Sequence, residues 1–338
     1  MVKRDNFQIA GRSIPPGRRA TVALPVTNMP DHTPVALSVH VVHGARPGPV
    51  MFVSAAIHGD EVIGVEIVRR LLRHPSLNGI AGTLLAVPIV NAFGFLTHSR
   101  HLPDRRDLNR SFPGSASGSL ASRLAYTFRT EVLARASHGI DLHSAAIHRS
   151  NLPQIRVSPG QPEALVLAQA FAAPVTLTSK MRDGSLRATA KQTGVTVLLF
   201  EGGEGLRVDE AAVKVALAGI LRVMAAIGML PASAAPRARA ATLHCPHSEW
   251  LRAAAAGLMT LRAEVGERVA AGRVLATISD PFGETKVELL APKPGILLGR
   301  AHLPLVNEGD ALFHLAELPQ DDADQGAEMD IPDEDEVI

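Results

Sequence analysis

An apolar run that ends in a histidine, with a glutamate three positions later, is the feature that most limits the fold of this chain. Residues 50–57 are apolar or small, His58 and Gly59 follow, and residues 62–72 carry apolar side chains at helical spacing. This pattern predicts a buried strand, a tight turn at Gly59 and then a helix. His58 and Glu61 therefore lie at the carboxyl end of a strand, where open α/β sheets place their functional sites.

A neutral imidazole and a carboxylate three residues apart can bind one divalent ion from the same side. Zinc accepts this set of ligands, and a catalytic zinc takes three protein ligands and leaves a fourth position for water. A second short apolar run closes on His143, which supplies the third ligand. Either histidine alone would more often be an ordinary buried residue, but the pair with Glu61 favours one Zn²⁺ on His58, Glu61 and His143. Asp141 is predicted to hold the second nitrogen of a ligand histidine.

Two further polar clusters accompany these ligands. One runs from Arg100 to Asp107-Leu-Asn109-Arg110, and the other is Glu201, which ends the apolar run of residues 197–200 and precedes two glycines. A carboxylate beside a metal-activated water molecule can take its proton, so Glu201 is the candidate general base. Arginine matches a carboxylate with two hydrogen bonds, so the cations of the first cluster suit an anionic substrate.

Four motifs, taken together and in this order, resemble the succinylglutamate desuccinylase/aspartoacylase family, a branch of the zinc carboxypeptidase superfamily. They are His58-Gly-Asp-Glu61, Asp107-Leu-Asn109-Arg110, Asp141-Leu-His143 and Phe200-Glu201-Gly. The resemblance covers roughly the first two thirds of the chain. It implies a zinc-dependent hydrolase that cleaves the amide bond of an N-acyl amino acid, with Glu201 as the catalytic glutamate.

The resemblance also implies roles for several polar residues. Asn109 and Arg110 would bind the substrate, and Arg100 would polarise the scissile carbonyl, with Arg105 and Arg106 as competitors for that position. A further family arginine, which binds the carboxylate of the amino acid, has no clear match here. The candidates for it are Arg149 and Arg156.

Three other functions remain open from the sequence. The same zinc chemistry would serve a metallocarboxypeptidase that acts on peptide or glutamyl C-termini, or a deacylase of a specialised metabolite. The third alternative is a non-catalytic, zinc-binding regulatory protein that uses its C-terminal part to bind partners. Substrate hydrolysis would separate the enzymes from the last of these.

Charge and composition limit the classes of partner that this chain is expected to bind. The net charge is +1, but ten of the 33 acidic residues lie in residues 317–338, so the rest of the chain carries +11. A basic body steers anionic small molecules. No basic run with interleaved aromatics indicates nucleic-acid binding, and no apolar run is long enough for a membrane span. The single cysteine, Cys245, and the lack of a secretion-signal pattern predict a cytoplasmic protein. A homo-oligomer is possible.

Alternating strand and helix patterns predict an α/β fold with a mixed, largely parallel sheet flanked by helices, as in zinc carboxypeptidases. Helices are expected over residues 119–134, 163–172 and 210–227. We assign residues 1–230 to the catalytic domain, 231–242 to a linker, 243–316 to a small all-β domain, and 317–338 to an acidic, disordered tail.

The all-β part resembles a barrel-sandwich hybrid domain of the biotinyl/lipoyl type. The resemblance rests on Val265-Gly-Glu-Arg-Val, Ala291-Pro-Lys-Pro-Gly295 and Val306-Asn-Glu-Gly309-Asp. Carrier domains present a modifiable lysine at a hairpin tip, whereas the corresponding turn here is Asp280-Pro-Phe-Gly-Glu. We therefore interpret this domain as structural, shaping or covering the mouth of the site.

Overall fold

The structure is a computed structural model that describes residues 4–29 and 31–318. Its strands in the first part of the chain are β1 (Phe7–Ile9), β2 (Arg12–Ile14), β3 (Arg18–Asn28), β4 (Pro34–His43), β5 (Arg46–Ala55), β6 (Ala81–Val87), β7 (His138–His143), β8 (Arg149–Val157), β9 (Val175–Thr178) and β10 (Thr196–Gly203). The helices are α1 (Ile63–Arg73), α2 (Ala92–Thr97), α3 (Leu120–Glu131), α4 (Pro162–Phe171), α5 (Leu186–Gln192) and α6 (Glu210–Ala226), with short 3₁₀ turns η1 (Pro75–Gly79), η2 (Leu108–Arg110), η3 (Leu133–Arg135) and η4 (Ala232–Ala234).

The remaining strands follow η4. They are β11 (Leu243–Cys245), β12 (Ser248–Arg252), β13 (Gly257–Leu261), β14 (Arg268–Val269), β15 (Val274–Ser279), β16 (Lys286–Leu290), β17 (Gly295–Ala301), β18 (Leu305–Val306) and β19 (Ala311–Glu317). One thirteen-stranded sheet has the order β12-β19-β17-β8-β10-β7-β5-β6-β4-β3, and β9, β11 and β14 pair beside this path. Its central strands β10, β7, β5 and β6 are parallel, and antiparallel strands flank them on both sides. The predicted mixed α/β fold is therefore confirmed, but the sheet is not largely parallel, because beyond these central strands and the pairs that β9 makes with β8 and β11 its strands run antiparallel.

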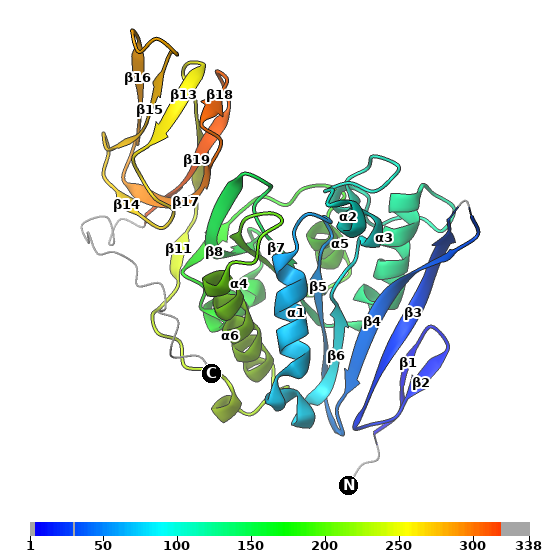
Figure 1. Cartoon of the computed structure of the whole chain (residues 1–338). Coiled ribbons are helices and arrows are strands. Elements are labelled where there is room, and N and C mark those ends of the chain that lie inside the picture. The colour runs from blue at the N-terminus through cyan, green and yellow to red at the C-terminus, as the bar shows by residue number, and fades with distance from the viewer. Residues whose placement is uncertain (1–3, 30, 319–338) are drawn as a thin grey trace.

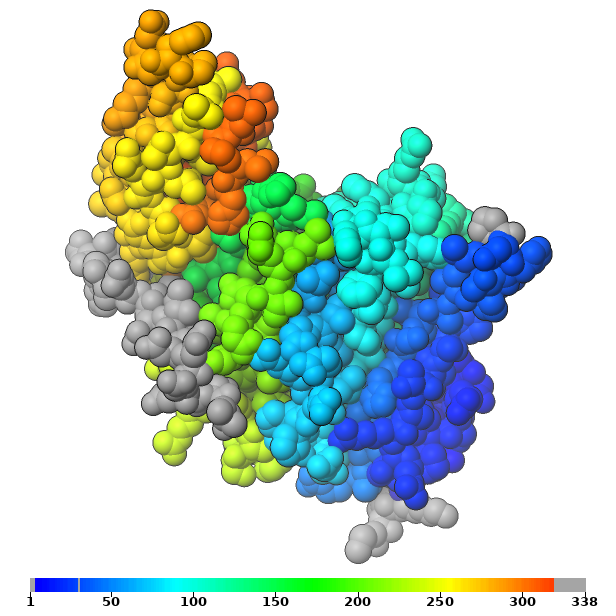
Figure 2. Space-filling model, in the orientation of Figure 1, coloured from blue at the N-terminus to red at the C-terminus, as the bar shows by residue number. Residues whose placement is uncertain are grey.

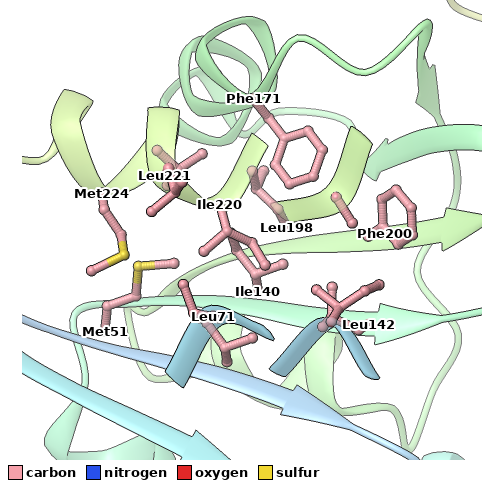
Figure 3. Packing of buried hydrophobic residues seen from close by; sticks show 14 of the residues in the cluster. Met51, Leu71, Ile140, Leu142, Phe171, Leu198, Phe200, Ile220, Leu221 and Met224 are labelled. Carbon is pink, nitrogen blue, oxygen red and sulfur yellow. The ribbon is translucent and has the colours of Figure 1, made fainter. Parts of the chain in front are cut away.

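The middle parts of the central strands are mainly apolar and buried because helices cover both faces of the sheet (Figure 1). Along β5, Met51 and Val53 belong to the core on one face, and Phe52 belongs to the core on the other. Helices α1, α4 and α6 cover the first face, where Leu71 packs near Met51 (Figure 3). Helices α3 and α5 cover the second, where the rings of Phe52 and Phe128 meet edge to face at 5.6 Å.

The three predicted helices form with small differences at their ends. Helix α3 begins after Ser119, whose side chain accepts a hydrogen bond from the backbone nitrogen of Ser122, as expected of a cap. The turn after β5 forms where it was predicted, but Gly59 is needed there for a different reason than its backbone conformation. Ala56 has the positive φ of 51°, whereas Gly59 is needed for space, because a Cβ there would lie 1.9 Å from the backbone of Gly94.

Residues 248–318, which we call the C-terminal module, stand beside β8 as a separate β lobe (Figure 1). A four-stranded sheet, β16-β15-β13-β18, forms one side of this lobe. The other side, β12, β19 and β17, continues the main sheet, because β17 pairs antiparallel with β8. Strand β11 also pairs with β9 of the main body. Figure 2 shows the upper surface hollowed between the yellow-to-orange module and the cyan segment.

The junction between module and body has an apolar core of its own. It joins Leu152 and Leu177 of the body to Ile296 and Leu298 of the module. Strand β19 includes Glu317, the first residue of the predicted acidic tail, and residues 319–338 of that tail lie outside the described residues. Among the described residues, no helix combines the length and apolar character that a membrane span requires.

Candidate active site

Three buried side chains meet where the carboxyl ends of β5 and β7 lie side by side. His58 follows β5, Glu61 precedes α1, and His143 is the last residue of β7; each is at most 4% exposed. The Nδ1 atoms of His58 and His143 both lie 2.6 Å from the Glu61 carboxylate, one at each oxygen. The three ligand atoms lie within 4.8 Å of one another, so one ion can contact all of them.

The second nitrogen of each histidine faces another carboxylate. Nε2 of His143 lies 2.8 Å from Asp141, as predicted, and Nε2 of His58 lies 3.2 Å from Asp107. Ser54 donates a hydrogen bond to the other oxygen of Asp141 at 2.7 Å. Carboxylates in this position orient metal-binding imidazoles and make the ligand nitrogen more basic. The two Nδ1 atoms and the Glu61 carboxylate therefore fit a divalent ion of the zinc type.

The electrostatics of the cluster agree with this geometry. Burial alone would raise the pKa of Glu61, but the two imidazoles hold it well below its ordinary value. Burial alone would lower the pKa of His143, yet Asp141 and Glu61 raise it well above its ordinary value. The cluster thus contains an ionised carboxylate and imidazole protons that a bound metal ion would displace.

Arg100 lies at the edge of this cluster and is held there by Asp107. Its guanidinium donates to the Asp107 carboxylate at 3.0 and 3.2 Å, and Nη1 lies 3.4 Å from Glu61 Oε1. Asp107 also accepts a hydrogen bond from the backbone of Asn109 at 2.8 Å, which starts η2. One carboxylate therefore links His58, Arg100 and Asn109.

Asn109 and Arg110 follow at the cavity wall. Asn109 is 6% exposed, and its Oδ1 accepts from the backbone nitrogen of Leu186 at 2.9 Å. This bond fixes the orientation of the amide and leaves Nδ2 as the end that can donate to a ligand. The Arg110 guanidinium donates to the carbonyl of Asn109 at 2.6 Å.

Glu201 approaches from the neighbouring strand. It lies within β10, directly opposite His143 in the parallel pairing with β7. Its Oε2 accepts a hydrogen bond from Nδ2 of Asn151 at 3.1 Å, and its Oε1 lies 3.4 Å from Nη1 of Arg156. The carboxylate is thus mostly buried, held by two residues of β8, and beside the metal-ligand cluster.

All nine predicted site residues line one cavity of about 670 Å³. They are His58, Glu61, Arg100, Asn109, Arg110, His143, Arg149, Arg156 and Glu201. Arg105 and Arg106, the competitors of Arg100, are not among the described residues that line this cavity. Seven lysines and arginines line the cavity against three glutamates, so its interior favours anions.

Arg187 is a cavity residue that the sequence analysis missed. It is 8% exposed; burial, and then the nearby Arg156, lower its pKa to about 10. Nη2 donates to Ser179 and to the carbonyl of Lys180, each at 3.2 Å, while the buried Nη1 has no partner among the described residues. The sequence feature that could have identified Arg187 is its position next to Leu186, at the buried start of a helix.

The C-terminal module supplies another part of the wall. The rings of Trp250 and His314 stack in parallel at 4.8 Å, and the guanidinium of Arg149 lies 5.0 Å from the centre of the Trp250 ring. Nε2 of His314 lies 2.9 Å from Ser248 Oγ. The expectation that this part of the chain shapes the mouth of the site agrees with these contacts.

Comparisons with known proteins support the predicted family. The family model of the succinylglutamate desuccinylase/aspartoacylase catalytic domain matches residues 47–227. A curated relative, N-alpha-acetyl-L-2,4-diaminobutyric acid deacetylase from Halomonas elongata, is 26% identical over 284 residues, which is 80% of this chain and 83% of the relative.

Two solved structures share the fold over most of the chain. A succinylglutamate desuccinylase/aspartoacylase from Rhodobacter sphaeroides has a TM-score of 0.79 at 25% identity, covering 89% of this chain and 96% of its own. The product-bound ectoine utilization protein EutE from Ruegeria pomeroyi has a TM-score of 0.78 at 23% identity, covering 94% and 97%. The chain belongs to the succinylglutamate desuccinylase/aspartoacylase family.

Proposed function

We propose that this protein is a zinc-dependent hydrolase that cleaves the amide bond of an N-acyl amino acid, with one Zn²⁺ per chain. One observation carries the proposal: two imidazole Nδ1 atoms converge on the Glu61 carboxylate, and Glu201 lies opposite His143 in the same cavity. The products are a carboxylic acid and a free amino acid. The deacetylase activity in the name of the Halomonas relative supports the same reaction class.

The metal and the base have separate tasks. His58, Glu61 and His143 would hold the zinc ion, which when bound would acidify a water molecule and act as a Lewis acid toward the carbonyl oxygen. Glu201 takes a proton from the attacking water at a carboxylate oxygen, and the water oxygen bonds to the carbonyl carbon. When the carbon–nitrogen bond breaks, Glu201 passes this proton to the amine nitrogen. Arg100 lies where it can donate to the negative charge that develops on the carbonyl oxygen.

The arginines select the substrate. Asn109 and Arg110 hold one carboxylate of the N-acyl amino acid at the side of the cavity next to Arg100. Arg156 and Arg187, which line the same cavity, have buried donor atoms, Nε and Nη1, with no partner among the described residues. Buried guanidinium donors are costly when unpaired, and a substrate carboxylate satisfies them. The cytoplasm remains the proposed compartment for this reaction.

The test is amine release by purified, zinc-loaded protein. The panel holds N-succinyl, N-acetyl and N-formyl amino acids beside short peptides with C-terminal glutamate, and His143→Ala, which removes a metal ligand, is the blank. The proposal predicts release from acylated amino acids with loss of activity in the blank. The acyl group that is cleaved fastest identifies the substrate class.

Two outcomes would contradict the proposal. Cleavage of the peptides alone would make the protein a metallocarboxypeptidase. Bound zinc without turnover, on the panel and on a wider set of acylated metabolites, would favour the non-catalytic, regulatory alternative.

A further inference from the structure

The pairing of β8 with β17 brings the C-terminal module close to Glu201. In this pairing Gly299 of the module lies opposite Asn151, and Gly299 also lies opposite His314 on its other side. Asn151 in turn lies opposite Gly203 of β10. A single row of residues therefore crosses the sheet from the module to the strand that carries Glu201.

Asn151 is the member of this row that contacts Glu201. The residue is 8% exposed, and its Nδ2 donates to Glu201 Oε2 at 3.1 Å. The register of β8 against β10 shifts between Glu201 and Gly203, and such irregularities re-aim side chains. The shift explains how Asn151, which is not directly opposite Glu201, comes within hydrogen-bonding distance of its carboxylate.

A neutral amide suits this contact. Arg156, which lies at the other carboxylate oxygen, is a cation, so the amide of Asn151 adds a hydrogen bond without adding a second charge. An amide donates one hydrogen bond, fixes the direction of the carboxylate, and exchanges no proton with it. The Asn151 contact therefore fixes the orientation of the Glu201 carboxylate.

Gly299 is needed for this arrangement because of space. A Cβ at Gly299 would lie 2.6 Å from Asn151 Oδ1 and 2.9 Å from the carbonyl oxygen of Ser150. Any larger residue in this position of β17 would push the Asn151 amide away from its present position. The module thus controls where the Asn151 side chain can lie.

We propose that Asn151 is the positioning residue for Glu201 and that Gly299 of the C-terminal module holds Asn151 in place. The module is then a working part of the catalytic apparatus as well as a wall of the cavity. This inference rests on the proposed function, in which Glu201 is the general base.

The test compares Asn151→Ala, Asn151→Asp and Gly299→Ala with the control Ser150→Ala. Ser150 pairs with the module in the same ladder but does not line the cavity. We expect Asn151→Ala to lower kcat about tenfold to hundredfold, the loss typical of a hydrogen bond to a charged group, with zinc content and KM nearly unchanged. Asn151→Asp keeps the shape but repels Glu201, so its kcat should fall at least as far.

Gly299→Ala should reproduce part of this loss, and its effect should shrink in the Asn151→Ala background because the two residues act in series. Ser150→Ala should retain the wild-type kcat. The inference is overturned if Asn151→Ala keeps full kcat while Glu201→Gln is inactive, or if Ser150→Ala loses as much as Asn151→Ala. Full activity in Glu201→Gln would instead remove the proposed function itself.

A crystal structure gives a readout that does not depend on turnover. In zinc-loaded Asn151→Ala and Gly299→Ala, the Glu201 carboxylate should leave its present position and turn toward Arg156. An unchanged Glu201 in both variants would contradict the positioning role.

Discussion

At the scale of single residues, the grouping of the candidate site residues followed from the sequence where the residue types were restrictive. Histidine and glutamate three positions apart, with a second strand-end histidine, have few uses other than binding a metal ion, and the structure places them together. Arginines are common on surfaces, so the sequence could not separate Arg149 and Arg156 from a solvated basic face, and it missed Arg187. Their burial against the cavity depends on tertiary packing that residue spacing does not report.

Substitution of Arg187 tests its part in substrate binding. Arg187→Met removes a buried donor that a substrate carboxylate would satisfy, so KM should rise about tenfold to hundredfold, with a smaller change in kcat. Because a buried, incompletely paired cation is costly, the free energy of unfolding should stay the same or increase. Arg187→Lys keeps the charge but loses the planar guanidinium that can donate two parallel hydrogen bonds, so its KM should lie between those of the wild type and Arg187→Met. An unchanged KM in Arg187→Met would exclude this role.

At the scale of elements, the turn that carries His58 shows what a pattern can and cannot predict. The strand, the turn and helix α1 were all expected from the apolar spacing. The sequence did not show why residue 59 must be glycine. Its backbone lies close to that of Gly94, which is 35 positions further along the chain, and local spacing gives no sign of such an approach. The strand that carries Glu201 also extends through Gly203, beyond the apolar run that predicted it.

Gly59→Ala should disrupt this turn. A Cβ at Gly59 would overlap the backbone of Gly94, so the free energy of unfolding should fall by more than about 2 kcal/mol, and zinc affinity should fall with it because His58 is adjacent. The matched control is Gly79→Ala, where a Cβ meets nothing within 4 Å. The control should change stability by less than about 0.5 kcal/mol. Equal stability and zinc content in the two variants would refute this explanation of Gly59.

Strand β19 adds a pH dependence to the junction of module and body. Burial, and then Arg156, lower the pKa of His314 to about 3, against an ordinary value of 6.5. The unfolded chain therefore binds a proton that the folded chain excludes between these pH values. The stability that His314 contributes is complete above pH 6.5 and falls as the pH drops toward 3.

The corresponding experiment is denaturant unfolding of the zinc-loaded wild type and His314→Gln at about pH 7 and about pH 5. The loss of stability between the two conditions should be smaller in the variant by about 2 kcal/mol, since each pKa unit corresponds to about 1.4 kcal/mol. The metal ligands titrate in both proteins and cancel in this comparison. Identical losses would show that His314 is not kept neutral by the fold.

At the scale of the whole molecule, the division into a main body and a C-terminal module could be predicted only in part from the sequence. A small all-β domain was expected here, and the strands described for the C-terminal module agree with it. Their continuity with the main sheet was not expected, because the pairing of β8 with β17 joins segments more than a hundred residues apart. That pairing brings Trp250 and His314 to the cavity and Gly299 to Asn151, so the C-terminal module lines the cavity together with the central strands.

The most direct test of the central claim is the rate of amide hydrolysis by Glu201→Gln at a zinc content matched to the wild type. Glutamine keeps the size of the side chain and the hydrogen-bonding contact at β8 but cannot take a proton. The proposed chemistry predicts one zinc per chain in both proteins and a kcat lower by about a hundredfold to ten-thousandfold in the variant. Full activity in Glu201→Gln would contradict it.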